Sequence, residues 1–254
     1  MAFFGLKTET FQAPKVKEKL ERFVSDFSIE VMPRTAEKIG DFKDLLPEKT
    51  RVYIAHIEGT PIEDMVKTAK RIAEDGFPTM PHFPARIIKD KATLNDWISR
   101  YQGEAGVNQA LLLGGGVDKP HGEYESSMDL LETGLFDQAN FKDIHVAGHP
   151  EGNKDIDPDG STKNVDAALQ WKQNFKNKTN AKMAITTQFA FDAGPIIEWA
   201  NSIKKAEIDI PIHIGIAGPA KLQTLIKFAL ACGVGPSLKA VSYTHLRAHE
   251  TQTH

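Results

Sequence analysis

Residues 52–82 read VYIAHIEGTPIEDMVKTAKRIAEDGFPTMPH, and this stretch decides the fold class. The apolar run 52–56 has the length of a buried strand, and residues 62–74 carry apolar side chains at helical spacing. A second short apolar run follows at 78–82. A strand, a helix and another strand in this order form a parallel βαβ unit.

The same alternation extends over most of the chain. Short apolar runs lie at 28–33, 52–56, 78–82, 110–116, 144–149, 184–188 and 212–216. Helical patterns lie at 15–27, 62–74, 92–101, 125–136, 164–177, 195–205 and 219–232. We therefore predict an α/β protein with a (β/α)8 TIM-barrel fold, present with about seven βα units because the C-terminus is truncated.

The domain boundaries follow from the same pattern. Residues 1–239 are expected to form a single (β/α) barrel domain that lacks its last unit. Residues 240–254 do not continue the strand pattern, and they hold three of the nine histidines. Their run 242–251 resembles a translated sequencing-adapter tail, so we expect a non-native tail that follows a broken reading frame near Lys239.

Composition excludes several classes of function. The formal charge of −3 gives no electrostatic reason to expect nucleic acid or an anionic membrane as a partner. The single cysteine, Cys232, excludes an internal disulfide and a thiolate metal cluster. No apolar run has the length of a membrane span, and the N-terminus lacks the apolar core of a secretory signal. We expect a cytoplasmic enzyme, and a homo-oligomer stays open.

Glu30 is the first candidate for chemistry. It lies between Ile29 and Val31 in an apolar run, where a carboxylate is costly to bury without a partner or a role. One interpretation is a structural pair with a cation such as Arg34. The other, which we favour in a barrel strand, is a general acid with a raised pKa.

His56, His82 and His149 each end an apolar run. Three histidines and a glutamate at the ends of barrel strands could bind a metal ion or could contact an organic ligand. Neither an H-x-H nor an H-E-x-x-H spacing is present. We therefore predict ligand contacts and no metal site.

Two further features indicate a ligand. Gly114, Gly115 and Gly116 end the most apolar run, and glycines let backbone N–H groups approach a phosphate, a flavin ring or a pterin. A tight turn explains such a run equally well. Gln188 ends the run 184–188, and an inward amide matches the edge of an amide-like heterocycle.

With these residues, the chain resembles the methylenetetrahydrofolate reductase family, flavin-dependent barrels that make methyltetrahydrofolate. The resemblance runs in register from about Ser28 to Ala231. It depends on Glu30 and on the segments PRT at 33–35, PH at 81–82, HPEG at 149–152, ITTQFAFD at 185–192 and GIAGP at 215–219.

The resemblance implies reduction of 5,10-methylenetetrahydrofolate to 5-methyltetrahydrofolate, with the hydride passed from NAD(P)H through FAD. Glu30 would be the general acid that helps to generate and protonate the folate iminium. Gln188 and Gly116 would bind the substrate. The implied cofactor-binding residues are His56, His82, Gly114, Gly115, His149 and Asn153.

The fourth strand departs from the family pattern. The family usually ends this strand with an arginine, a glycine and an aspartate that touches flavin and pterin, whereas this chain has Gly114 to Gly116, with Asp118 slightly later. A lysine that the family places on its fifth helix has Lys172 and Lys176 as nearby candidates. Two alternatives therefore stay open, namely a non-redox folate-binding barrel in one-carbon transfer and a flavin-independent reductase.

Overall fold

A computed structural model describes residues 13–190, 192–218, 223, 224 and 226. Its seven strands form one parallel sheet in sequence order. The strands are β1 (Ile29–Val31), β2 (Val52–Ile54), β3 (Thr79–Pro84), β4 (Gln109–Leu113), β5 (Asp143–Gly148), β6 (Lys182–Ala190) and β7 (Ile212–Ile216). The predicted α/β class is confirmed.

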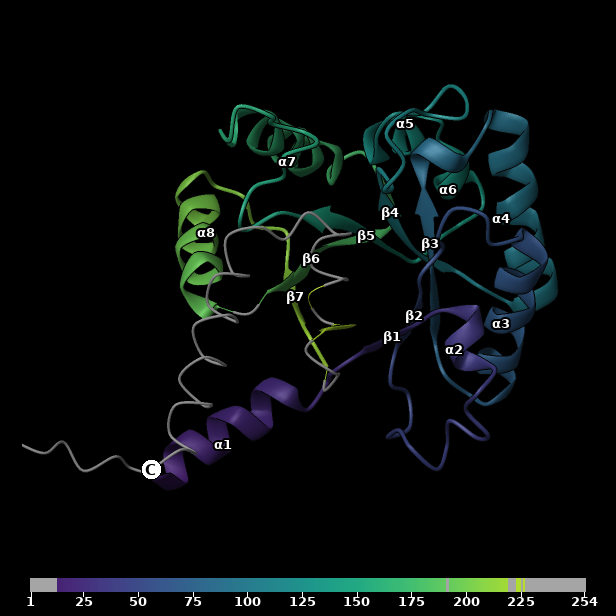
Figure 1. The fold of residues 1–254 in the computed structure, drawn as a ribbon, viewed down its shortest axis with the longest axis horizontal. Helices are drawn as coiled ribbons and strands as arrows, with labels where there is room; N and C mark the ends of the chain where they lie inside the picture. The colour runs from purple at the N-terminus through teal and green to yellow at the C-terminus, as the bar shows by residue number, and fades with distance from the viewer. Residues whose placement is uncertain (1–12, 191, 219–222, 225, 227–254) are drawn as a thin grey trace, which may run out of the picture.

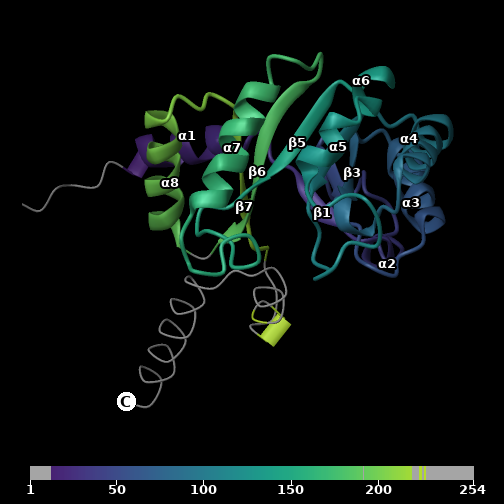
Figure 2. The ribbon, with the colours of Figure 1, turned by 90° about the horizontal axis from the view of Figure 1, so that it is seen from above.

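Helices separate the strands and cover the outer side of the curled sheet (Figures 1 and 2). They are α2 (Pro33–Ala36), α3 (Ile62–Glu74), a 3-10 turn η1 (Ala85–Ile87), α4 (Lys91–Ala105), α5 (Ser127–Glu132), α6 (Leu135–Gln138), α7 (Lys163–Phe175) and α8 (Ala193–Lys205). A further helix, α1 (Ala13–Val24), precedes β1. The arrangement is that of a TIM barrel, with β1 and β7 as the two sheet edges in the described part of the chain.

Side chains alternate between the two faces of the sheet. Val31, Ile54 and Phe83 belong to the large core between the strands and the outer helices. Tyr53, Met80 and Leu111 form a separate, smaller cluster on the inner face. Because successive side chains of a strand point to opposite faces, Glu30 and His82 share the inner face with this smaller cluster.

The helix predictions agree with the structure in most places. Residues 62–74 are α3 as predicted, whereas the helix predicted at 125–136 is two short helices, α5 and α6. Gly134 separates them in the left-handed conformation, at φ 69°, which ends the first helix. Most of the helix predicted at 219–232 and all of the segment 240–254 lie outside the described residues.

A β-bulge interrupts the pairing of β6 with β7. Thr186 pairs with His213 and Phe189 pairs with Gly215, so β6 has one residue more than β7 between these two points. A bulge turns the side chains that follow it. Simple alternation along the strand therefore does not determine the direction of the Gln188 side chain. The residues that contact Gln188 determine it instead.

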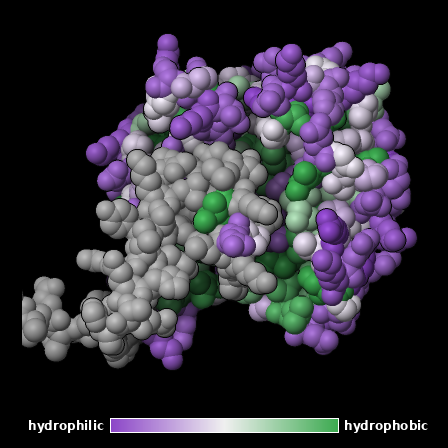
Figure 3. Space-filling view, in the orientation of Figure 1, coloured by the Kyte–Doolittle hydropathy of each residue, from purple (hydrophilic) through white to green (hydrophobic). Residues whose placement is uncertain are grey.

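The surface is polar over the outer helices. Figure 3 shows the face of the molecule that is seen in Figure 1. Coloured residues around the edge of this face are mainly hydrophilic, and hydrophobic residues lie nearer to its middle. On α1, Leu20 and Phe23 are exposed apolar residues. Among the described residues, no helix combines the length and apolar character that crossing a membrane requires.

Candidate active site

The inner face brings Glu30 and His82 together. Oε2 of Glu30 on β1 lies 3.2 Å from Nε2 of His82 on β3, although the contact is not aligned as a hydrogen bond. The His82 side chain is only 11% exposed, whereas that of Glu30 is 58% exposed. The Glu30 carboxylate is therefore accessible to solvent, whereas the His82 ring is mostly buried.

Two opposing effects act on the pKa of Glu30. Burial at the strand raises this pKa, whereas the polar contact with His82 and its charge lower it, and the net direction is downward. The raised pKa expected from the sequence is therefore wrong. The reason is the partner, because the contact with His82 stabilises the carboxylate more than partial burial destabilises it.

His56 follows β2 and packs against α4. Its ring stacks on Trp97 of α4, with centroids 4.8 Å apart, and its Nε2 lies 3.0 Å from the carbonyl oxygen of Thr60. Burial lowers the pKa of His56, so the ring is neutral near pH 7 and Nε2 donates to that carbonyl. Nδ1 is then an acceptor, and it is buried without a hydrogen-bond partner.

The glycines after β4 separate into two kinds. Gly115 has φ 99°, and a Cβ there would lie 3.1 Å from Cβ of Pro84, so a tight turn accounts for it. Gly116 has no heavy atom within 4 Å of the position that a Cβ would take. Open space at Gly116 is compatible with close approach of a ligand to the backbone.

Arg86 of η1 holds the turn that contains these glycines. Its backbone N–H donates to the carbonyl oxygen of Gly114 (2.9 Å), and its Nη1 donates to that of Val117 (3.1 Å). Its Nε donates to the carbonyl oxygen of Glu125 (3.1 Å). The loops after β3 and β4 are therefore fastened to each other beside the candidate site.

A second cluster lies where β5 and β6 end. His149 follows β5, and burial, followed by the charge of Lys172, lowers its pKa to about 4, while a hydrogen bond with Gln188 acts in the opposite direction. Nδ1 of His149 is buried without a hydrogen-bond partner. The bulge in β6 thus leaves Gln188 next to His149.

Lys172 on α7 is the lysine that reaches this cluster. It is 6% exposed, and its Nζ donates to the carbonyl oxygen of Ala147 on β5 at 3.3 Å. Burial lowers its pKa to about 8. Lys176, the other candidate, instead pairs with Asp209 at 2.8 Å.

Asn153 lies in the loop after β5. Its Oδ1 accepts from the backbone N–H of Asp155 (2.9 Å), and its carbonyl oxygen accepts from that of Asp157 (2.8 Å). The buried carboxylate of Asp157 accepts from the backbone N–H groups of Asn164 (2.9 Å) and Val165 (3.1 Å). The contacts of Asp157 connect the loop to the start of α7. The oxygens of Asn153 accept hydrogen bonds from within the loop.

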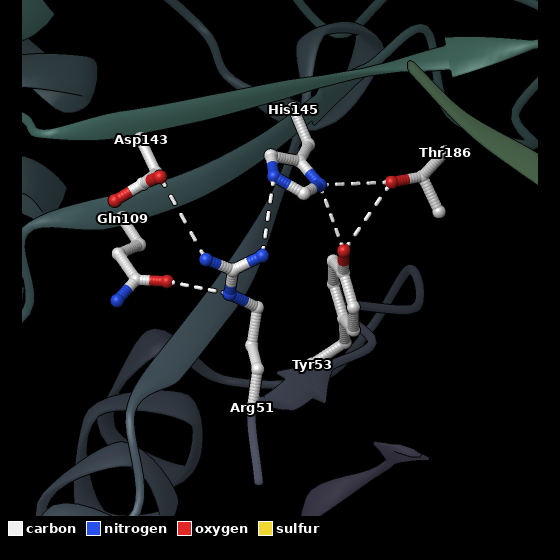
Figure 4. Close-up of polar contacts among 6 residues, drawn as sticks. All are labelled: Arg51, Tyr53, Gln109, Asp143, His145 and Thr186. Carbon is white, nitrogen blue, oxygen red and sulfur yellow. Dashed lines mark hydrogen bonds and ion pairs between the residues drawn. The ribbon is translucent and has the colours of Figure 1, made fainter. Parts of the chain in front are cut away.

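The structure also reveals a polar network that sequence reasoning missed (Figure 4). It crosses the barrel interior and is made by Arg51, Tyr53, Gln109, Asp143, His145 and Thr186. The available signal was Tyr53, His145 and Thr186 at inward positions of apolar strands. No cluster of three metal-ligating side chains is found among residues 13–190, 192–218, 223, 224 and 226.

A comparison with protein families agrees with this geometry. The model of the family described as methylenetetrahydrofolate reductase matches residues 27–238. The match covers β1 to β7 and therefore every candidate site residue described above. The chain belongs to the methylenetetrahydrofolate reductase family, and this membership implies a folate-linked oxidoreductase.

Proposed function

We propose that the protein reduces 5,10-methylenetetrahydrofolate to 5-methyltetrahydrofolate, with NAD(P)H as the hydride source and FAD as the carrier. The observation that supports this most directly is the Glu30–His82 pair on the inner face of the barrel, with its carboxylate exposed. Family membership supplies the substrate class. We further propose a cytoplasmic location.

Glu30 would protonate the folate. Opening the methylene bridge breaks a C–N bond, and the departing nitrogen needs a proton while the carbon becomes an iminium that accepts hydride. The contact with His82 lowers the pKa of Glu30. A bound heterocycle would cover the exposed carboxylate, and removal of water raises a carboxyl pKa towards the range of a general acid.

The residues at the strand ends fit a cofactor with several polar atoms. Nδ1 of His56 is a buried acceptor and Nδ1 of His149 is a buried ring nitrogen, both without hydrogen-bond partners, and the backbone at Gly116 is open. We propose that His56, His82, Gly114, Gly115, His149 and Asn153 hold FAD, with Lys172 as an added positive charge, and that Gln188 and Gly116 bind folate. When bound, FAD would accept a hydride from NAD(P)H and release it to the substrate.

The test is spectroscopic and kinetic. Purified protein mixed with FAD should retain flavin absorbance after desalting, and it should oxidise NADH or NADPH over many turnovers when methylenetetrahydrofolate is present. Glu30→Gln should retain FAD but lose turnover. Undiminished turnover in this variant would refute the acid role, and absence of turnover in the wild type with FAD bound would refute the reductase.

The replacement of the family's fourth-strand arginine, glycine and aspartate by Gly114 to Gly116 favours a second candidate. Without that aspartate, the barrel could bind folate for a non-redox one-carbon transfer, or it could act as a flavin-independent reductase. A protein that binds 5-methyltetrahydrofolate but takes up no FAD would support these alternatives. Folate-dependent NAD(P)H oxidation without FAD would support the flavin-independent reductase and exclude the non-redox transfer.

A further inference from the structure

The interior of this barrel holds polar side chains where TIM barrels usually pack branched aliphatic ones. Three of them, Tyr53, His145 and Thr186, form what we call the hydroxyl cluster. Nδ1 of His145 lies 2.7 Å from Oη of Tyr53 and 3.0 Å from Oγ1 of Thr186. The two hydroxyl oxygens are 3.3 Å apart. Figure 4 shows the three side chains facing one another.

The position of the ring proton on His145 follows from its other neighbour. His145 is 2% exposed, and burial, followed by the nearby charges of Arg51 and His213, lowers its pKa to about 3. The ring is therefore neutral at physiological pH. Nη1 of Arg51 lies 3.4 Å from Nε2, and a guanidinium can only donate. Nε2 is thus the acceptor, and Nδ1 carries the hydrogen.

The hydroxyl cluster then has one more donor hydrogen than it has hydrogen bonds to form. Nδ1–H donates to Oη of Tyr53, which is the shorter of its two contacts. The two hydroxyl groups can form one hydrogen bond with each other, and only one of them can be its donor. In the described part of the chain, no acceptor is found for the other hydroxyl hydrogen.

Exposure decides which hydroxyl keeps the spare hydrogen. Tyr53 is 4% exposed, whereas Thr186 is only half-buried. The arrangement that leaves no buried donor unpaired has Tyr53 donating to Thr186 and Thr186 directing its own hydrogen away from the cluster. A hydroxyl donor on a half-buried side chain is thereby held on the inner face of β6.

This donor lies among the residues of the proposed site. Thr186 precedes the bulge after which Gln188 meets His149, and Tyr53 is in register with Glu30 on the neighbouring strand. We propose that Thr186 is a substrate-binding residue whose hydroxyl donates to an acceptor atom of the folate heterocycle, and that Tyr53 and His145 are positioning residues. The inference depends on the proposed folate substrate.

The binding test compares two substitutions at one position. With the full chain, the Kd of 5-methyltetrahydrofolate should rise about fivefold in Thr186→Val, which corresponds to one lost hydrogen bond. Thr186→Ser keeps the hydroxyl and should restore binding to within about twofold of the wild type. Thr68→Val is a matched control, because the buried Thr68 hydroxyl donates only to the Asp64 carbonyl oxygen within α3.

The outcomes separate this inference from the proposed function. Wild-type affinity in a folded Thr186→Val protein would overturn the role of Thr186 and leave the folate substrate intact. A wild-type protein that binds no 5-methyltetrahydrofolate would overturn both. Nitrogen-15 NMR of labelled histidines supplies a readout without ligand: His145, assigned with His145→Gln, should show a protonated Nδ1 and a bare Nε2. The opposite tautomer would overturn the positioning argument.

Discussion

Replacing Lys172 by methionine should make the protein more stable at neutral pH. The Lys172 ammonium is buried, and its pKa falls from 10.5 to about 8. A difference of this size means that keeping the charge in the folded protein costs about 3 kcal/mol at pH 7. Its 3.3 Å contact with the carbonyl oxygen of Ala147 returns about 1 kcal/mol. Methionine keeps the apolar stem, so the net gain is about 2 kcal/mol.

The pH dependence gives a sharper test than the gain itself. Below pH 8 both folded and unfolded chains bind the Lys172 proton, so the burial cost is fully present. Between pH 8 and 10.5 the unfolded chain binds more protons than the folded one, so this lysine's cost declines as the pH rises. The stability advantage of Lys172→Met should therefore shrink over this window.

Urea unfolding followed by circular dichroism at pH 7, 9 and 10 measures both effects. Lys163→Met, at an exposed position on the same helix, is the matched control and should change stability by less than about 0.5 kcal/mol. A Lys172→Met protein that is less stable than the wild type at pH 7 would refute the reasoning. So would an advantage that stays constant up to pH 10.

Further outcomes follow from individual contacts. Glu30→Gln should lower kcat at least about a hundredfold with little change in FAD retention, measured by steady-state NAD(P)H oxidation. Asp157→Ala removes the acceptor for two N–H groups at the start of α7 and should cost about 2 kcal/mol in urea unfolding; an unchanged midpoint would contradict this capping role. Gly115→Ala should lose about 1–2 kcal/mol because of its positive φ and the close Pro84. Gly116→Ala should keep its stability but bind ligand more weakly, and unchanged affinity would argue against close backbone approach there.

The sequence predicted the order of strands and helices well because periodicity is a local property. Residues 62–74 became α3, and β7 has the predicted bounds of 212–216. The split between α5 and α6 was missed because a single Gly134 decided it. The family resemblance was confirmed by the match over residues 27–238.

The candidate site was predicted residue by residue but not as a set of contacts. Glu30 and His82 were chosen separately, and their pairing changed the direction of the Glu30 pKa. His56 was grouped with His82 and His149, yet its ring packs on Trp97 of α4. Whether these residues bind substrate and cofactor stays a prediction.

The sequence by itself therefore determined the alternation of strands and helices, the positions of polar residues at strand ends and the family. Tertiary structure alone decided which side chains meet. His145 contacts Tyr53 and Thr186, which are 92 and 41 residues away in the chain. Such contacts depend on the register of parallel strands and on one bulge, and a register is set by the packing of the whole sheet rather than by any local pattern.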